Sequence, residues 1–285
     1  MLVSMNPLLE HAQKNHTIVP AFNVYNLETI QAVARGAKAA GCPVIFAVGE
    51  SYLDHISPEM AFAMVHQAAQ EHGLLCALHL DHAKKADSIE RVLGAGFTSV
   101  MFDGSRFSLQ QNIQLTAQMA QKAHAAGASI EGELGYMNPE DGSGEQLVAE
   151  QTHTLPQDAA EFVRRTGADA LAVAVGNAHG VYHSKPQLNL PRIQEIFRST
   201  GVPLVLHGAS GIPMEQLQLA AARGVQKINV NTELALTGAS AILQLGAAQP
   251  SLRLEKAMRA ACEAMEQVVT QLCAALCVPN GRPEQ

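Results

Sequence analysis

The sequence contains no tryptophan, and only 4% of its 285 residues are aromatic and 16% charged. So few aromatic side chains exclude an aromatic-rich binding surface, while 47% hydrophobic residues exclude a disordered chain. The formal net charge of −7 argues against a nucleic-acid binder, which needs a basic face. We therefore expect an α/β protein with a buried core and no nucleic-acid partner. Any phosphate group must be bound by a local site, because the chain as a whole is acidic.

The sequence also lacks a targeting signal and a pattern of cysteines typical of disulfide bonds. The first residues carry no basic region and reach Glu10 before any long apolar run, which argues against a signal peptide or membrane span. The odd number of cysteines forms no CxxC pair and no disulfide framework. They are Cys42, Cys76, Cys262, Cys273 and Cys277. We expect a cytoplasmic protein with reduced cysteines and no membrane partner.

One pattern recurs along the chain: a helical stretch, a glycine, one or two residues and then a β-branched apolar run. The glycines are Gly41, Gly73, Gly96, Gly127, Gly167, Gly201 and Gly224. Each is expected to end a helix in the left-handed conformation. With the opening run, the expected strands are residues 18–24, 43–48, 75–80, 98–102, 129–133, 169–175, 203–207 and 226–229. Strands alternating with helices in this way favour a (β/α)8 TIM barrel that forms a single domain over residues 1–285.

Two further segments stand out from this rhythm. Residues 134–155 are rich in Gly, Asn, Pro, Glu and Asp and are too long for a simple connection, so we expect a functional lid loop. After the last strand, residues 232–249 and 252–276 have helical spacing. We expect extra C-terminal helices, with an extension at about 250–277 that packs on the barrel or on a partner subunit.

Polar residues follow the expected strands at the ends where barrel enzymes carry their active sites. Three of them are histidines, at the ends of the third, sixth and seventh strands: His82, His179 and His207. With carboxylates nearby, they predict a catalytic zinc site with one open position. His79 lies two residues before Asp81 on the same strand, so a structural or supporting role is expected for it.

Two loops have the features of a phosphate cradle. Gly208–Gly211 follows the seventh strand and Asn229–Thr232 follows the eighth, and each leads into a helix. Loops at these places feed helix N-termini, which attract phosphate. A neighbouring metal site then implies a substrate whose phosphate and oxygen functions lie a few atoms apart.

These segments together resemble the class II fructose/tagatose-bisphosphate aldolase family, nearer its tagatose-type members. The resemblance covers about residues 5 to 275 and depends on short motifs that occur in the same order as in the family. They are Pro20–Val24, His79–His82, Met101–Ser105, Glu131–Gly135, Gly176–Tyr182, Leu206–Gly211 and Lys227–Thr232. It implies reversible cleavage of a ketose 1-phosphate or 1,6-bisphosphate to dihydroxyacetone phosphate and an aldehyde. It also implies a homodimer or homotetramer.

The resemblance implies a role for each matching residue. Zinc (Zn²⁺, one ion per subunit) is expected on His82, His179 and His207, with Glu133 and Asp103 nearby. Asp81 and the lid residue Glu140 are expected to move protons, and Asn229 to contact the enediolate. The substrate and its phosphate are expected to contact Asn23, Gly180, Gly208, Ser210, Asn231 and Thr232, with Lys185 and Arg259 as further candidates. A monovalent cation, Na⁺ or K⁺, is expected beside the phosphate.

The chain departs from the family pattern after the second strand. Relatives carry small neutral residues there, whereas this chain has Glu50, with Asp54 close behind. A carboxylate near the distal end of the substrate leaves open an aldolase for a non-bisphosphate sugar or a sugar-acid 1-phosphate. A zinc barrel hydrolase would use the same three histidines, but it is disfavoured because the first strand lacks His-x-His. A non-catalytic sugar-phosphate-binding barrel would keep the phosphate loops without needing the histidines and carboxylates.

Overall fold

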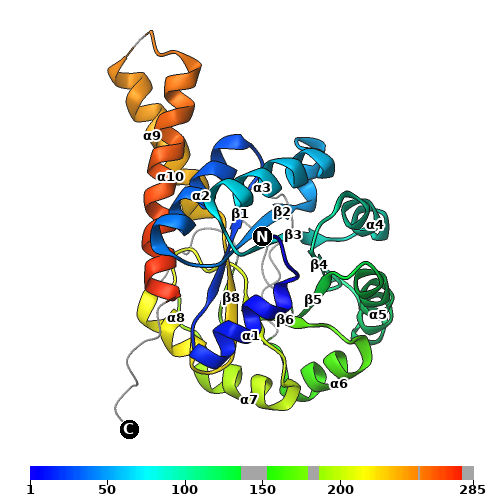
Figure 1. The fold of residues 1–285 in the computed structure, drawn as a ribbon. Coiled ribbons are helices and arrows are strands. Elements are labelled where there is room, and N and C mark those ends of the chain that lie inside the picture. Colours follow the sequence, from blue (N-terminus) through cyan, green and yellow to red (C-terminus); the bar gives the residue numbers. More distant parts are fainter. Residues whose placement is uncertain (136–152, 179–185, 250, 278–285) are drawn as a thin grey trace.

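The computed structural model describes residues 1–135, 153–178, 186–249 and 251–277. The strands pair in parallel in chain order and close on themselves, since β1 pairs with both β2 and β8 (Figure 1). They are β1 (Val19–Asn23), β2 (Val44–Gly49), β3 (Cys76–Ala83), β4 (Ser99–Phe102), β5 (Ser129–Leu134), β6 (Ala170–Val173), β7 (Leu204–Leu206) and β8 (Val225–Val230). This is the predicted TIM barrel.

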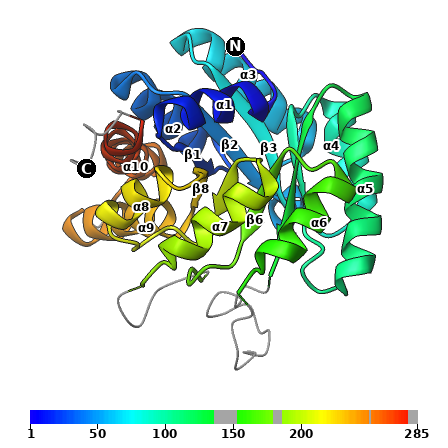
Figure 2. The same ribbon diagram turned by 90° about the horizontal axis from the view of Figure 1, so that it is seen from below.

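Helices surround the strands in both views (Figures 1 and 2). They are α1 (Met5–Asn15), α2 (Leu27–Ala40), α3 (Pro58–His72), α4 (Ala86–Ala95), α5 (Leu109–Ala125), α6 (Pro156–Thr166), α7 (Leu190–Thr200), α8 (Met214–Ala221), α9 (Thr232–Ala248) and α10 (Leu254–Leu276), with the 3-10 helix η1 (Glu50–Asp54) after β2. All seven glycines predicted to end helices have positive φ, from 64° to 116°. Five of them directly follow a helix, and Gly127 comes one residue later, after Ala126. Gly224 does not end α8, which stops at Ala221. The alternation of helices and strands read from the sequence is confirmed.

Helix α1 lies across the floor of the barrel and was not predicted. Its residues Met5, Leu8, Leu9 and Ala12 are buried in one apolar cluster with residues of β1, β2, β3, β6 and β7. The backbone N–H of Met5 donates to the Ser129 hydroxyl at 3.0 Å, which ties α1 to β5. The floor is thus sealed by apolar contacts, and polar groups inside the barrel lie above it.

Helices α9 and α10 run side by side and extend beyond the barrel (Figure 1). Their bounds agree with the two C-terminal helices expected from the sequence. Helix α10 packs along α2, and its end meets the barrel where Ile18 donates its backbone N–H to the Leu276 carbonyl at 3.0 Å. None of the helices in the described parts of the chain has both the length and the apolarity to cross a membrane.

The contact between α2 and α10 depends on Gly36. A Cβ atom there would lie 2.6 Å from Val269 Cγ1 and 2.9 Å from the Glu266 carbonyl oxygen, which is backbone and cannot easily move. We expect Gly36→Ala to lower the free energy of unfolding by about 1–3 kcal/mol, the usual cost of overpacking. Urea denaturation followed by circular dichroism measures this.

Gly94 in α4 provides the matched control, because a Cβ there meets nothing within 4 Å. Gly94→Ala should stabilise the protein by up to about 1 kcal/mol through helix propensity alone. If both variants change stability in the same direction and by the same amount, the packing argument for Gly36 is wrong.

Candidate active site

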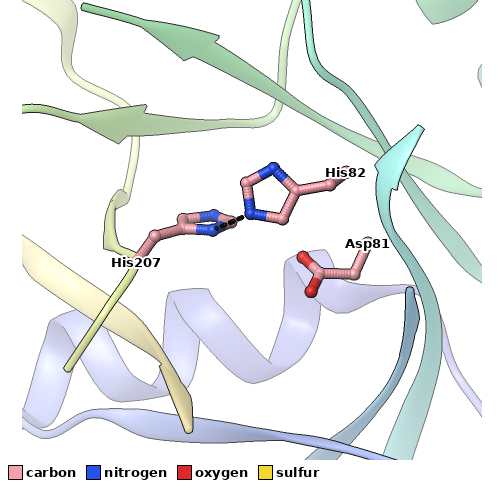
Figure 3. Close-up of side chains that lie close together, drawn as sticks. All are labelled: Asp81, His82 and His207. Carbon is pink, nitrogen blue, oxygen red and sulfur yellow. Dashed lines mark hydrogen bonds between the residues drawn. The ribbon is translucent and has the colours of Figure 1, made fainter. Parts of the chain in front are cut away.

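The carboxyl end of β3 has an irregular backbone. His82 has a φ of 50°, and the pairing of β3 with β4 shifts register between Leu80 and Ala83. Neighbouring residues on a regular strand point to opposite faces, yet Asp81 and His82 both turn toward His207 (Figure 3). A left-handed non-glycine residue costs about 1–3 kcal/mol and persists where its surroundings hold it. Here the strain brings two adjacent polar side chains to one site.

His82 and His207 face each other across the barrel mouth (Figure 3). Nε2 of His82 lies 2.8 Å from Nδ1 of His207. The other ring nitrogens face carboxylates: His207 Nε2 lies 2.8 Å from Glu131, and His82 Nδ1 lies 3.4 Å from Asp103 and 3.6 Å from Glu133. Because a neutral imidazole has one N–H, which these carboxylates attract, both facing nitrogens present lone pairs. Such a pair is stable only with a cation or a proton between the rings.

Asp81 is held on both sides by amide groups. Asn23 donates to Oδ2 at 3.0 Å and Asn229 donates to Oδ1 at 2.9 Å. Burial raises the pKa of the Asp81 carboxyl, but His82, His207 and Lys227 outweigh burial and hold that pKa well below its usual range. Asp81 is therefore an ionised carboxylate in a fixed orientation beside the histidine pair.

Below the histidine pair lies a buried ion pair. Lys227 donates to Glu131 and to Asn229, each at 2.8 Å, and the Lys227 and Glu131 side chains are fully buried. Burial raises the pKa of Glu131, but Lys227 and His207 lower it more, to about 2. Glu131 therefore stays ionised and holds His207 from behind.

The two expected phosphate loops lie next to each other. The Ser210 hydroxyl accepts from the backbone N–H of Glu233 at 3.4 Å, so the loop after β7 contacts the first turn of α9. Gly208 and Gly211 in that loop have φ values of 62° and 90°. Asn231 donates to the Tyr52 hydroxyl at 3.2 Å and, with Thr232, lines a pocket that also includes Tyr25 and His55.

This geometry agrees with what the chain matches among known proteins. A family model described as fructose-bisphosphate aldolase class-II matches residues 3–281. The chain belongs to the class II fructose-bisphosphate aldolase family. It is therefore an aldolase, which is a lyase.

Solved structures of aldolases have the same fold. The YdjI aldolase from Escherichia coli K12 is 32% identical, with a TM-score of 0.87 and 98% of each chain covered. A putative fructose-1,6-biphosphate aldolase from Coccidioides immitis is 30% identical, with a TM-score of 0.87 and 96% of each chain covered. Fructose-bisphosphate aldolase from Campylobacter jejuni is 22% identical, with a TM-score of 0.84 over 98% of this chain and 97% of its own, and supports the fold alone.

The residues of this class II aldolase fit a divalent metal ion. Two tetrahedral ligand atoms, each about 2.0–2.1 Å from zinc, lie roughly 3.3 Å apart. The facing nitrogens of His82 and His207 are 2.8 Å apart, so a small increase in this distance would admit the ion. Carboxyl groups crowd this site: burial raises the pKa of Glu133, the neighbouring Asp103 carboxylate raises it further, and Glu133 Oε2 has no hydrogen-bond partner among the described residues. Burial lowers the pKa of His82, but Asp81, Asp103 and Glu133 outweigh it and raise that pKa to about 10. The site thus favours positive charge at the histidine pair.

Four predicted site residues fall outside the described residues: Glu140, His179, Gly180 and Lys185. Arg259 lies in a groove between α2 and α10 with Glu28 and Arg35, rather than with the histidine pair. The other predicted residues lie at the carboxyl ends of β1, β3, β4, β5, β7 and β8. Their roles stay predictions.

Glu50 has partners that the sequence did not reveal. Its carboxylate accepts from the backbone N–H groups of Lys84 and Lys85, at 3.1 and 3.2 Å, at the start of α4. These donors would otherwise be free to bind an anion. Because Gly49 pairs with Asp81, Glu50 lies at the same rim as the histidine pair.

Proposed function

We propose that this class II aldolase reversibly cleaves a ketose 1-phosphate or 1,6-bisphosphate to dihydroxyacetone phosphate and an aldehyde, with one zinc ion. The observation that supports it best is the facing pair His82 and His207, each backed by a carboxylate, beside the fixed Asp81. An imidazole whose other nitrogen contacts a carboxylate is the usual form of a metal-ligating histidine.

His82, His179 and His207 would hold the ion, with Asp103 and Glu133 next to it. When bound, zinc supplies Lewis-acid polarisation of the ketone and stabilises negative charge on its oxygen. Glu131 fixes the His207 tautomer from behind, so Nδ1 is the nitrogen turned to the site. Because this chemistry needs no Schiff base, the buried Lys227 need not be a nucleophile.

Asp81 would take the proton of the substrate's C4 hydroxyl during cleavage. It is ionised, oriented by Asn23 and Asn229, and adjacent to His82. The Asn229 amide would donate to the developing enediolate. A carbon proton is handled by a second group, for which Glu140 of the lid is the candidate.

The loops after β7 and β8 would bind the phosphate of dihydroxyacetone phosphate. Gly208, Ser210, Asn231 and Thr232 lie on these loops, and α9 begins at Thr232. Backbone N–H groups and the positive end of a helix suit a phosphate group. Gly180, Lys185 and a Na⁺ or K⁺ ion complete the proposed phosphate site.

We also propose that the enzyme assembles as a homodimer or homotetramer and works in the cytoplasm.

Turnover assays on tagatose and fructose 1-phosphates and 1,6-bisphosphates test the proposal. Release of dihydroxyacetone phosphate, measured by coupled reduction, supports it. Hydrolysis to inorganic phosphate or another non-aldol product would favour the zinc hydrolase. Binding of ketose phosphates with no turnover by metal-loaded protein would favour a non-catalytic barrel.

Glu50 leads to a prediction about the distal end of the substrate. Its carboxylate already occupies the N–H groups of Lys84 and Lys85 and adds negative charge at the rim. We expect kcat/KM for 1-phosphates to equal or exceed that for 1,6-bisphosphates, because like charges repel in a partly desolvated site. Glu50→Gln should raise kcat/KM for a bisphosphate by about tenfold, or ~1.4 kcal/mol.

Asp54→Asn, on the same 3-10 helix, is the matched control and should have a smaller effect. The expectation is wrong if the wild-type enzyme strongly prefers bisphosphates and Arg259→Ala removes that preference. Arg259 would then reach the active site of a neighbouring subunit and bind the distal phosphate there.

A further inference from the structure

Lys227 is a fully buried lysine inside the barrel, and it contacts two residues of the site, Glu131 and Asn229. Its ammonium group lies 2.8 Å from Glu131 Oε2 and 2.8 Å from Asn229 Oδ1. Burial of an ammonium group is costly unless it is paired and hydrogen-bonded. This lysine has both kinds of partner, and each partner contacts a different group of the proposed machinery.

The first partner, Asn229, has its amide orientation fixed by charges on both sides. Its Oδ1 accepts from Lys227, while its Nδ2 donates to Asp81 at 2.9 Å and lies 3.4 Å from His207 Nδ1. The opposite orientation would turn an amide oxygen toward a carboxylate and an amide NH₂ toward an ammonium group. Lys227 thus makes Asn229 present a donor to the histidine pair.

The second partner, Glu131, links Lys227 to His207. Glu131 Oε2 accepts from Lys227, which leaves Oε1 to contact His207 Nε2 at 2.8 Å. With the Lys227 charge removed, Glu131 would be an uncompensated buried carboxylate. The orientation and tautomer of His207 therefore depend on a lysine from the neighbouring strand β8.

We infer that Lys227 is a positioning residue, which holds the Asn229 amide and the Glu131–His207 pair in the orientations that the metal and the enediolate require. This inference rests on the proposed function, because it assigns Lys227 to the same site. Lys227 itself does not touch the substrate.

Lys227→Met tests the inference, since methionine has a similar length but no donor and no charge. Loss of such a supporting contact costs about 10- to 100-fold in metal affinity or activity. We expect kcat at saturating metal to fall by that factor, with a smaller change in KM, and Co²⁺ affinity, measured by visible absorption in competition with a chelator, to fall about tenfold. Gln226→Met is the matched control: Gln226 precedes Lys227 on β8, and its side chain is directed to Ala221 of α8. It should leave both quantities nearly unchanged.

An uncompensated Glu131 could prevent Lys227→Met from folding, so a second pair of variants is needed. Glu131→Gln keeps the Lys227 contact with Asn229, and the ammonium group is still balanced by the nearby Asp81 carboxylate, with which it interacts electrostatically. Glu131→Gln/Lys227→Met removes that contact without leaving an unpaired Glu131 carboxylate. We expect kcat of the double variant to be at least about tenfold below that of Glu131→Gln. Equal kcat values in the two would overturn the role at Asn229, and unchanged Co²⁺ affinity in folded Lys227→Met would overturn the role at His207. If the wild-type enzyme cleaves no ketose phosphate, the proposed function fails, while the Co²⁺ titration still decides the role at His207.

Discussion

Removal of metal with a strong chelator is expected to lower the rate of ketose phosphate cleavage by at least about 10³-fold, and added Zn²⁺, Co²⁺ or Mn²⁺ to restore it. A Lewis acid supplies several kcal/mol of charge stabilisation to the transition state. A loss of about 4 kcal/mol corresponds to about 10³-fold in rate. The steady-state rate before and after dialysis, together with metal content, measures the effect.

His207→Ala should reproduce this loss without a chelator. His207 contributes the nitrogen that faces His82, and its side chain is fully buried. His124→Ala is the matched control, because His124 also contacts a carboxylate, Asp169 at 2.9 Å, but lies on the outside of the barrel with 45% of its side chain exposed. The control should keep its metal and its activity. Full activity in metal-free protein, or in His207→Ala, would contradict the zinc mechanism.

The barrel could be predicted because its signals are local. Glycines at helix ends and apolar runs mark each βα unit, and eight such units close in only a few ways. Helix α1 was missed although its buried residues Met5, Leu8, Leu9 and Ala12 have the spacing of an amphipathic helix. It precedes the first strand and ends at His16 rather than at a glycine, so it stands outside the repeat that marks the other units.

The site could be predicted only in outline. Barrel topology places strand-end residues together, which is why the sequence alone indicates Asp81, His82 and His207 as site residues. The partners of Glu131 and Glu133 were not predictable, because two inward residues on one strand lie in different layers of the barrel. Glu131 meets Lys227 from 96 positions away, whereas Glu133 faces His82. Local sequence pattern carries no information about such pairings.

Backbone irregularity sets a further limit. Alternation along β3 predicts that Asp81 and His82 point to opposite faces, and the positive φ of His82 overturns it. Likewise, the sequence suggested that Glu50 faces the distal end of the substrate, and the structure adds that its two oxygens accept from backbone N–H groups. The direction of the His82 side chain and the partners of Glu50 both depend on the local backbone conformation, which side-chain type alone does not encode.

Asp81→Ala is expected to lower the rate of aldol cleavage by about 10²- to 10⁴-fold, the usual contribution of a general acid or base. Cleavage needs one group for the C4 hydroxyl proton and another to protonate the enediolate carbon, and these protons lie on different atoms. Asp81 is fixed by Asn23 and Asn229 beside the histidine pair, which suits the hydroxyl. Asp81→Ala should therefore still exchange the C–H proton of dihydroxyacetone phosphate with solvent, because exchange needs no aldehyde proton.

Glu140→Gln is expected to show the opposite pattern. Glu140 belongs to the predicted lid, outside the described residues, and would reach the carbon when the lid closes over bound substrate. This variant should lose exchange of the dihydroxyacetone phosphate proton and slow cleavage, with the metal content unchanged. Asp141→Asn, one residue further, is the matched control and should exchange normally. Deuterium incorporation followed by NMR separates the two carboxylates: exchange at the wild-type rate in Glu140→Gln would move the carbon acid to Asp141 or another group, and loss of exchange in Asp81→Ala would mean that Asp81 serves both protons.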